Sequence, residues 1–90
     1  MAILIKADSE QSPVLPVGKT FTLKEMYPII ECELVEAVYL SDGCILWIDG
    51  EGKLKNKPRN YVATALASNV LGVSDYISGH ALLTERLEVG

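Results

Sequence analysis

The chain lacks most of the residues from which metal sites and disulfide scaffolds are built. Its 90 residues include only two cysteines, Cys32 and Cys44, and a single histidine, His80. A first-row metal site usually takes three or four nitrogen, sulfur or oxygen ligands, and these residues follow none of the familiar ligand spacings. We therefore expect no metal and no cofactor, and we expect both cysteines to remain reduced thiols.

Long apolar runs are also missing. The run after Met1 covers residues 2–5 and is followed by Lys6, so it is too short for the core of a secretion signal. No stretch approaches the roughly 20 apolar residues that a membrane-spanning helix needs. These absences favour a protein that acts in the cytoplasm.

Positive charge is scarce in the chain as a whole. There are 8 lysines and arginines against 12 aspartates and glutamates, which gives a formal net charge of −4. Non-specific binding to DNA depends on neutralising phosphates across a broad basic surface. We therefore do not expect this protein to bind long nucleic acids.

The length and the overall balance of residue types indicate one small globular domain. Hydrophobic residues make up 49% of the chain and charged residues 22%, which is ordinary for a globular protein. A chain of 90 residues can bury only a small core, and a second subunit would add buried surface. We expect a single domain over residues 1–90 that forms a homo-oligomer, most simply a dimer.

The pattern of apolar residues predicts four to five strands in a mainly antiparallel sheet. Residues 31–40 and 44–49 are separated by Ser-Asp-Gly, which is typical of a hairpin turn. The remaining strands are expected at 2–7, at 75–84 and, as a short edge strand, at 14–17. Both hairpin strands carry apolar groups on both faces, so we expect helices on one face and a second sheet or subunit on the other.

Two helix starts are marked by capping residues. Thr22 precedes the first helix, and Glu25 three residues later completes a capping box. Pro28 limits this helix to about two turns, because proline in a helix interior costs about 3 kcal/mol. Asn60 precedes a second helix over residues 61–72, which a glycine ends. The sequence thus predicts an α+β fold with two short helices on one side of the sheet.

Half of the positive charge lies in one segment, residues 49–60, which we call the basic loop. Lys53, Lys55, Lys57 and Arg59 fall within seven positions of this loop, directly before the second helix. Backbone N–H groups at a helix N-terminus attract anions, and an arginine can bind a phosphate through two hydrogen bonds. The loop therefore indicates a site for a small anion. The alternative is a solvated connection whose lysines keep the protein soluble.

Aromatic and polar residues near the basic loop extend this candidate site. Tyr61 and Trp47 are candidates for stacking on a nucleobase, although an aromatic residue on a central strand is also typical of a core. Asn60 and Thr64 flank the amides of the helix start. The predicted ligand-binding residues are Lys53, Lys55, Lys57, Arg59, Asn60, Tyr61, Thr64 and Trp47.

No group of residues has the spacing of a known catalytic site. Glu31, Glu33 and Glu36 could supply paired carboxylates for acid–base chemistry, but we favour a charged edge that protects a strand from aggregation. His80 could form a nucleophile–base pair with Cys32 or Cys44 only if the fold brought them together, and no catalytic motif surrounds it in the sequence. We expect a protein that is not an enzyme.

Three segments of the chain resemble a known family. Phe21 to Glu25 match its F-(S/T)-L-x-E helix, and Glu51 to Thr64 match most of its N-E-(D/E)-G-K-L-x-x-x-P-x-N-x-x-A-T segment. Residues 75–83 match D-Y-I-x-G-x-A-L-L. The chain resembles a family of small uncharacterised domains of bacteriophages, plasmids and other bacterial mobile elements. It departs from the pattern at Asp49-Gly50, where the family usually has Asn-Glu.

The resemblance implies a mobile-element protein in the cytoplasm of a bacterial host, where small proteins of this kind often blunt host defence. Together with the basic loop, it leads us to expect a non-enzymatic accessory protein that binds and sequesters a small anionic, nucleotide-like immune signal. Two alternatives remain open. One is a protein–protein inhibitor of a host defence enzyme, and the other is a structural accessory of the mobile element.

Overall fold

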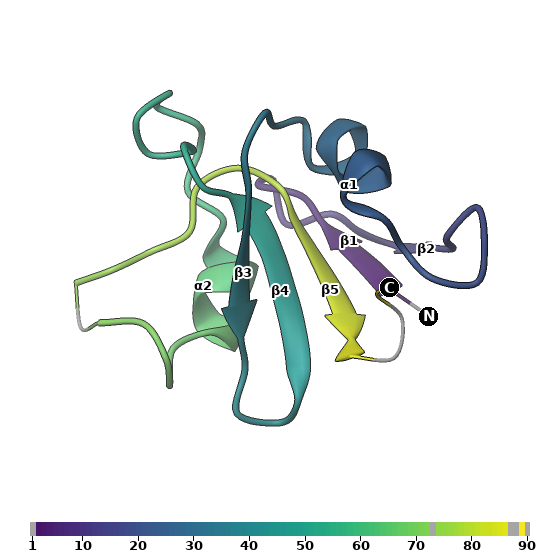
Figure 1. Cartoon of the computed structure of the whole chain (residues 1–90). Coiled ribbons are helices and arrows are strands. Elements are labelled where there is room, and N and C mark those ends of the chain that lie inside the picture. The colour runs from purple at the N-terminus through teal and green to yellow at the C-terminus, as the bar shows by residue number, and fades with distance from the viewer. Residues whose placement is uncertain (1, 73, 87–88, 90) are drawn as a thin grey trace.

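The chain folds around one antiparallel sheet. A computed structural model describes residues 2–72, 74–86 and 89, with five strands in the order β2-β1-β5-β4-β3 (Figure 1). The α+β fold and the mainly antiparallel sheet are confirmed. The strands are β1 (Ala2–Ile5), β2 (Gln11–Val14), β3 (Val35–Tyr39), β4 (Cys44–Asp49) and β5 (Ala81–Glu85), and the helices are α1 (Leu23–Ile30) and α2 (Tyr61–Leu66).

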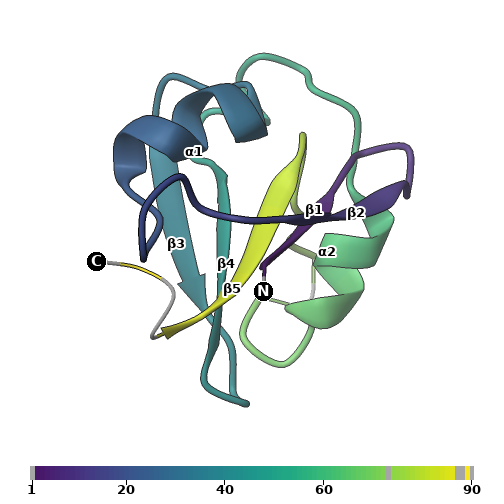
Figure 2. The same ribbon diagram turned by 90° about the vertical axis from the view of Figure 1, so that its right-hand side faces the viewer.

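The two helices lie on opposite faces of the sheet (Figure 2). Met26 of α1 packs in one core with Leu82, while Ala63 of α2 packs in another core with Ala81. Adjacent residues of a strand point to opposite faces, so β5 contributes to both cores. The expectation of two helices on one side is therefore wrong. The central strands are apolar on both faces, and each face needs its own cover.

This arrangement removes one reason for expecting a dimer. We expected a second sheet or subunit to cover one face of the β3–β4 hairpin. The structure instead places Val35 and Trp47 in the core under α1, and Val38 and Leu46 in the core under α2. The expectation of a homo-oligomer now depends on the small size of the chain alone, and it stays a prediction.

The hairpin between β3 and β4 has the predicted turn. The Leu40 amide donates to the Cys44 carbonyl at 2.9 Å, and Gly43 adopts a φ of 91° that a residue with a side chain would rarely adopt. Asp42 accepts a hydrogen bond from the Cys44 amide at 3.0 Å. Cys32 lies outside this ladder, and both cysteines are thiols in the structure.

Helix α1 begins with the capping box that its sequence predicts. The Thr22 hydroxyl accepts a hydrogen bond from the Glu25 amide at 3.3 Å, and the Glu25 carboxylate accepts one from the Thr22 amide at 3.3 Å. Pro28 lies inside the last turn, and the helix ends at Ile30, before the capping residue Glu31, which has a left-handed φ of 61°. The length of two turns is confirmed, but a left-handed residue ends the helix, not the proline.

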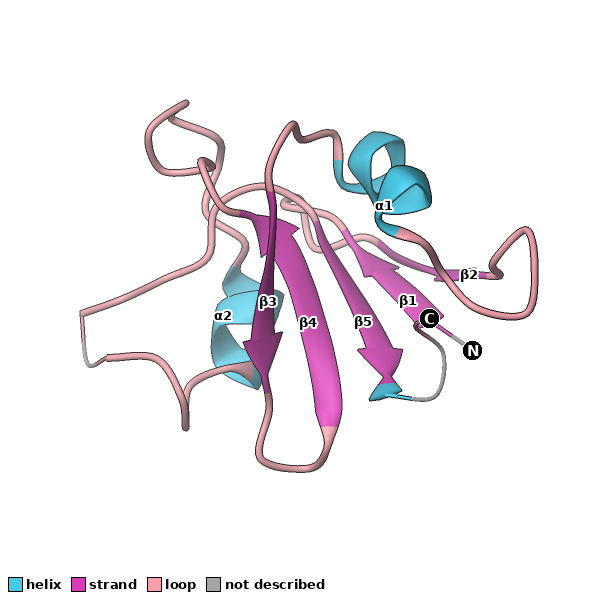
Figure 3. Ribbon diagram, in the orientation of Figure 1, coloured by secondary structure: helices cyan, strands magenta, loops and turns pink. Residues whose placement is uncertain are grey.

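Several other elements are shorter than the sequence suggests or lie at different residues. Helix α2 ends at Leu66, and residues 67–70 continue as turns. Residues 74–80 form a loop before β5 (Figure 3). The edge strand β2 covers Gln11–Val14 where we expected 14–17, and β3 covers Val35–Tyr39 where we expected 31–40.

Within the described residues, no helix is long and apolar enough to cross a membrane.

Asn60 connects α2 to the sheet. Its side chain is fully buried, and its Oδ1 accepts a hydrogen bond from the Ala63 amide at 3.0 Å as the predicted helix cap. Its Nδ2 donates to the carbonyls of Ile5 at 2.9 Å and Gly79 at 3.0 Å. Its backbone amide donates to the Ile77 carbonyl at 2.7 Å. One side chain thus joins the helix start, the end of β1 and the segment before β5.

We predict that Asn60→Ala will lower the free energy of unfolding by about 2–4 kcal/mol, because it removes a helix cap and the donors of two buried carbonyls. Urea unfolding followed by circular dichroism measures this change. Asn69→Ala, at an exposed turn position, is the matched control and should change stability by less than about 0.5 kcal/mol. Equal losses in the two variants would contradict a central role for Asn60.

Candidate functional site

The basic loop folds around a buried carboxylate. The Asp49 side chain has no exposed surface, and its Oδ2 lies 2.7 Å from the Lys57 ammonium and 3.3 Å from the Lys55 ammonium. Its Oδ1 accepts a hydrogen bond from the Glu51 amide at 2.8 Å. Burial alone would raise the pKa of Asp49, but the hydrogen bonds from Lys57, the Glu51 amide and Lys55 hold this pKa below its usual value.

Lys53 is paired with a carboxylate from a distant part of the chain. Its ammonium contacts Asp75, whose carboxylate also accepts the Tyr76 amide at 2.8 Å. The hydrogen bond from Lys53, together with the one from the Tyr76 amide, lowers the pKa of Asp75. The side chains of this pair are 48% and 42% exposed, so the pair contributes little to stability and can exchange partners.

Arg59 differs from the three lysines of the basic loop. Its guanidinium carbon lies 4.0 Å from the centroid of the Tyr76 ring and 5.7 Å from that of Tyr61. Among the described residues, no carboxylate pairs with Arg59. Stacking on an aromatic ring orients a guanidinium but uses none of its N–H donors. Arg59 is therefore held in place with donors available for an anion.

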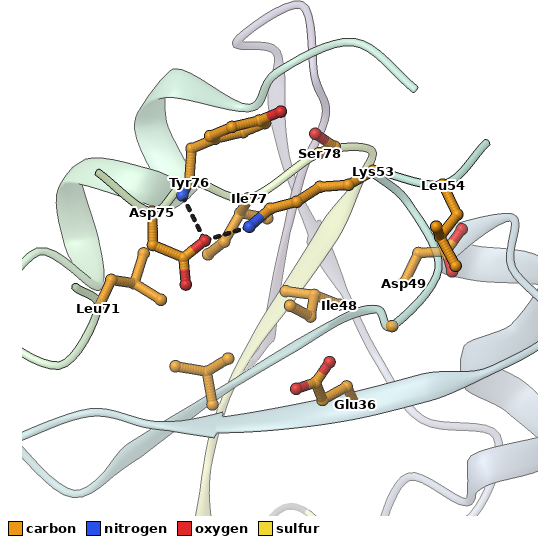
Figure 4. A pocket seen from close by; sticks show the side chains of 12 residues that line it. Glu36, Ile48, Asp49, Lys53, Leu54, Leu71, Asp75, Tyr76, Ile77 and Ser78 are labelled. Atoms are coloured by element: carbon orange, nitrogen blue, oxygen red, sulfur yellow. Dashed lines mark hydrogen bonds and ion pairs between the residues drawn. The ribbon is translucent and has the colours of Figure 1, made fainter. Parts of the chain in front are cut away.

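A cleft of about 340 Å³ lies beside the loop, on the face of the sheet that α2 covers (Figure 4). Its apolar wall includes Val38 of β3, Ile48 of β4, and Leu71 and Ile77 from the segment after α2. All four also pack against the α2 core or belong to it. Because α2 is only six residues long, it leaves this part of the sheet open.

A shallower pocket of about 210 Å³ adjoins the cleft, and we call it the basic pocket. It is lined by Lys53, Asn56, Lys57, Arg59, Tyr76 and Ser78. Lys53, Tyr76 and Ser78 line both hollows, so an apolar space opens directly onto a basic one. The arrangement suits a molecule with a flat apolar part and an anionic group.

Gly52 allows the basic loop to approach the segment before β5. A Cβ atom at this position would overlap the carbonyl oxygen of Ser78. The Lys57 amide donates to the Gly52 carbonyl at 2.9 Å, and Arg59 forms an isolated antiparallel bridge with Ser78. Only glycine permits such close backbone contact, and this contact brings Tyr76 beside Lys53 and Arg59.

Four of the predicted binding residues lie at or near the basic pocket. Lys53, Lys57 and Arg59 line it, and Tyr61 lies beside Arg59 with 67% of its surface exposed. Lys55 faces Asp49 instead, and this interaction raises its pKa against the opposing effect of burial. Lys57 also donates to the Glu31 carbonyl, so its ammonium has a structural role as well.

The other three predicted binding residues make internal contacts. All polar side-chain atoms of Asn60 are hydrogen-bonded inside the protein. The Thr64 hydroxyl donates to the Asn60 carbonyl at 2.7 Å and accepts the Ile77 amide at 2.9 Å. Trp47 donates to the Thr84 hydroxyl at 2.9 Å and packs on the α1 face, away from the cleft. The polar groups of all three residues are thus engaged inside the protein, and a role for them in binding stays a prediction.

Two amides of the α2 start, which we expected to lie behind the anion, are bonded inside the protein. The Ala63 amide is bonded to the Asn60 side chain, and the Thr64 amide to the Asn60 carbonyl. In their place, the fold brings three residues to the site that the charge pattern does not reveal: Tyr76, Asp75 and Glu36. Tyr76 and Asp75 belong to the D-Y-I segment that matches the family motif. That match could have marked them as candidates, but it does not indicate what they do.

His80 is engaged at both ring nitrogens. Its Nδ1 accepts the Ala7 amide at 3.2 Å, and its Nε2 lies 3.3 Å from the Glu31 carboxylate. Neither nitrogen is left to activate a cysteine. In the part of the chain that the structure describes, no three histidine, cysteine, aspartate or glutamate side chains gather as a metal site requires.

The chain belongs to a family described as a domain of unknown function, DUF3846, whose model matches residues 1–89. This match confirms that the chain belongs to an uncharacterised domain family. Comparisons with curated proteins and with solved structures gave no match.

We predict that the Asp49 contacts make the fold sensitive to acid. Because the pKa of Asp49 is lower in the folded protein, the ionised carboxylate stabilises the fold above its ordinary pKa of about 3.9. This stabilisation is lost as the pH falls through the folded pKa. Asp49→Asn should lower the free energy of unfolding by about 1–3 kcal/mol at pH 7 and by a smaller amount at pH 3.

Urea unfolding at pH 7 and pH 3 measures both quantities for the wild type and the variant. Asp8→Asn is the matched control, because Asp8 is exposed and its carboxylate accepts the amide of the nearby Glu10. Loss of stability in Asp49→Asn that is the same at both pH values would contradict the role of the charge.

Proposed function

We propose that this DUF3846 protein is a non-enzymatic binder of a small anionic, nucleotide-like molecule. The single observation that supports this proposal best is the junction of the apolar cleft with the basic pocket, at which Arg59 is stacked on Tyr76. In this proposal the base of the ligand enters the cleft, and its phosphate lies in the basic pocket. Arg59 binds the phosphate through two parallel hydrogen bonds.

Lys53 is the second phosphate contact in this proposal. Its ammonium lies between the two hollows, where it is paired with Asp75 and lies 4.7 Å from the Tyr76 ring centroid. A half-exposed ion pair costs little to rearrange, so a phosphate can replace Asp75 as the partner of Lys53. The acidic body of the protein repels anions, and a local basic pocket is the place where this repulsion is overcome.

Two tyrosines are suited to contact the base or sugar of the ligand. Tyr76 lines both hollows, and Tyr61 is 67% exposed on the other side of Arg59. Stacking on an aromatic side chain contributes about 1–3 kcal/mol per base and accepts any base. In this proposal the polar groups of the site hold the anion, and the aromatic rings add affinity by stacking without taking part in a reaction.

We further propose that binding serves to sequester the ligand. The resemblance to proteins of phages, plasmids and other mobile elements suggests an anti-defence role, in which the protein removes a nucleotide immune signal from the host cytoplasm. Both ring nitrogens of His80 are engaged, so it is not poised as a catalytic base. A bound molecule would be held and not converted.

A protein–protein inhibitor is the second candidate, and an apolar surface beside α1 favours it. Leu15, Val17 and Leu23 are 75%, 93% and 51% exposed, and the Val17 amide is bonded to Glu25 of α1 at 3.0 Å. Grouped apolar side chains on a surface often mark a binding site for another protein. The same surface would also serve a structural accessory or a homo-oligomer.

We predict that nucleotides will raise the melting temperature of the wild-type protein. A ligand present at 100 times its Kd adds about 2.7 kcal/mol to the free energy of unfolding. Thermal-shift measurements with mono-, di- and cyclic nucleotides test this directly. If no nucleotide raises the melting temperature, the proposed function is wrong and the protein–protein alternative gains support.

For a nucleotide that binds, Arg59→Ala should weaken affinity about 10- to 150-fold, because a hydrogen bond to a charged group contributes about 1.5–3 kcal/mol. Isothermal titration calorimetry gives the Kd. Arg86→Ala removes the same side chain at an exposed position that lines neither hollow, and it should bind like the wild type. Equal affinities in all three proteins would exclude Arg59 as a phosphate contact.

A further inference from the structure

One carboxylate in the cleft is not neutralised by the protein. Three acidic residues line this space: Asp49, Asp75 and Glu36. Asp49 is held by Lys57, and Asp75 is held by Lys53. Within the described residues, Glu36 has neither an ion pair nor a hydrogen bond for its side chain. A carboxylate that lines a cleft without a partner is a hydrogen-bond acceptor available to a ligand.

Glu36 is placed across the cleft from the cations. It lies on the edge strand β3 opposite Ile48 of β4. Its Oε2 is close to Gly50 of the basic loop, 3.4 Å from the position that a Cβ atom would take there. Figure 4 shows Glu36 on the side of the cleft across from Lys53 and Asp75. The cleft therefore has an acceptor on one side, an apolar middle and the basic pocket beyond its other side.

This polarity selects among the nucleobases. A carboxylate only accepts hydrogen bonds, and its two oxygens can take two neighbouring donors at once. Guanine presents two adjacent donors, N1–H and the exocyclic amino group, on its Watson–Crick edge. In adenine and cytosine the amino group is next to an acceptor nitrogen, and in uracil the single N–H lies between two carbonyls. Only guanine meets a carboxylate without a repulsive contact.

We propose that Glu36 determines base specificity and that the ligand is a guanine nucleotide. This inference rests on the proposed function, since it assumes that the base enters the cleft. In this arrangement the Glu36 carboxylate accepts both donors of guanine, Val38 and Ile48 contact the ring, and the phosphate reaches Arg59. The other bases lose affinity because their acceptors face a negative charge and one carboxylate oxygen is left without a partner.

The test is isothermal titration calorimetry with GMP, AMP, CMP and UMP on the wild type and on Glu36→Gln. The wild type should bind GMP about 10- to 100-fold more tightly than the other three nucleotides. Glu36→Gln replaces one acceptor with an amino group that opposes a guanine donor. This variant should weaken the affinity for GMP about 10-fold or more and change the affinity for AMP by less than about 3-fold.

Glu33→Gln is the matched control for the loss of one negative charge. Glu33 is exposed, precedes β3 and does not line the cleft. This variant should keep the wild-type preference for GMP. Arg59→Ala should weaken the affinity for all four nucleotides to a similar extent, because it removes a contact with the phosphate that they share.

The outcomes separate this inference from the proposed function. If none of the four nucleotides binds to the wild type, both are overturned. If they bind and depend on Arg59 but GMP is not preferred, or if Glu36→Gln keeps the preference, only the role of Glu36 is overturned. Loss of the preference in Glu36→Gln, with the preference kept in Glu33→Gln, supports it.

Discussion

The candidate site depends on the burial of one carboxylate, Asp49. A buried charge is costly unless it is paired and hydrogen-bonded, and this one is satisfied by Lys55, Lys57 and the Glu51 amide. These contacts draw the basic loop back onto the end of β4. The loop then lies against Ser78, where Gly52 permits close approach. The pairing of Asp49 thus acts together with the Arg59–Ser78 bridge and the Lys53–Asp75 pair to hold the basic loop beside Tyr76.

The cleft is a consequence of how the sheet is covered. The central strands are apolar on both faces, and one short helix is available for each face. Helix α2 ends after six residues, so it covers only part of its face. Val38 and Ile48 remain at the wall of an open space that the segment after α2 and the basic loop enclose.

The four cations of the basic loop have different roles. Lys55 and Lys57 stabilise the loop through Asp49, and Lys53 is held at the border of the two hollows by Asp75. Arg59 is stacked on an aromatic ring and keeps its donors. This division follows from the chemistry of the side chains. A lysine is a flexible point charge, whereas an arginine presents several donors in a fixed plane that suits phosphate.

The sequence by itself determined the local structure of this protein. The capping box of Thr22 and Glu25, the Asn60 cap, the Ser-Asp-Gly hairpin and the order of the elements depend on residues close together in the chain, so each was predictable. The position of the basic loop was predictable for the same reason. The start of β5 was not predictable, because Ile77 and Gly79 bond to the distant residues Asn60 and Pro58. The end of α2 was not predictable either, because the apolar pattern continues past Leu66.

Tertiary structure alone decided which helix covers which face, which cations are neutralised, and which residues complete the site. Tyr76, Asp75 and Glu36 reach the basic loop from other segments, and no local pattern pairs Lys53 with Asp75 or leaves Glu36 without a cation. The physical reason is that a charge acts on whatever lies within a few ångströms. In a folded chain, that neighbour is determined by packing and not by distance along the sequence.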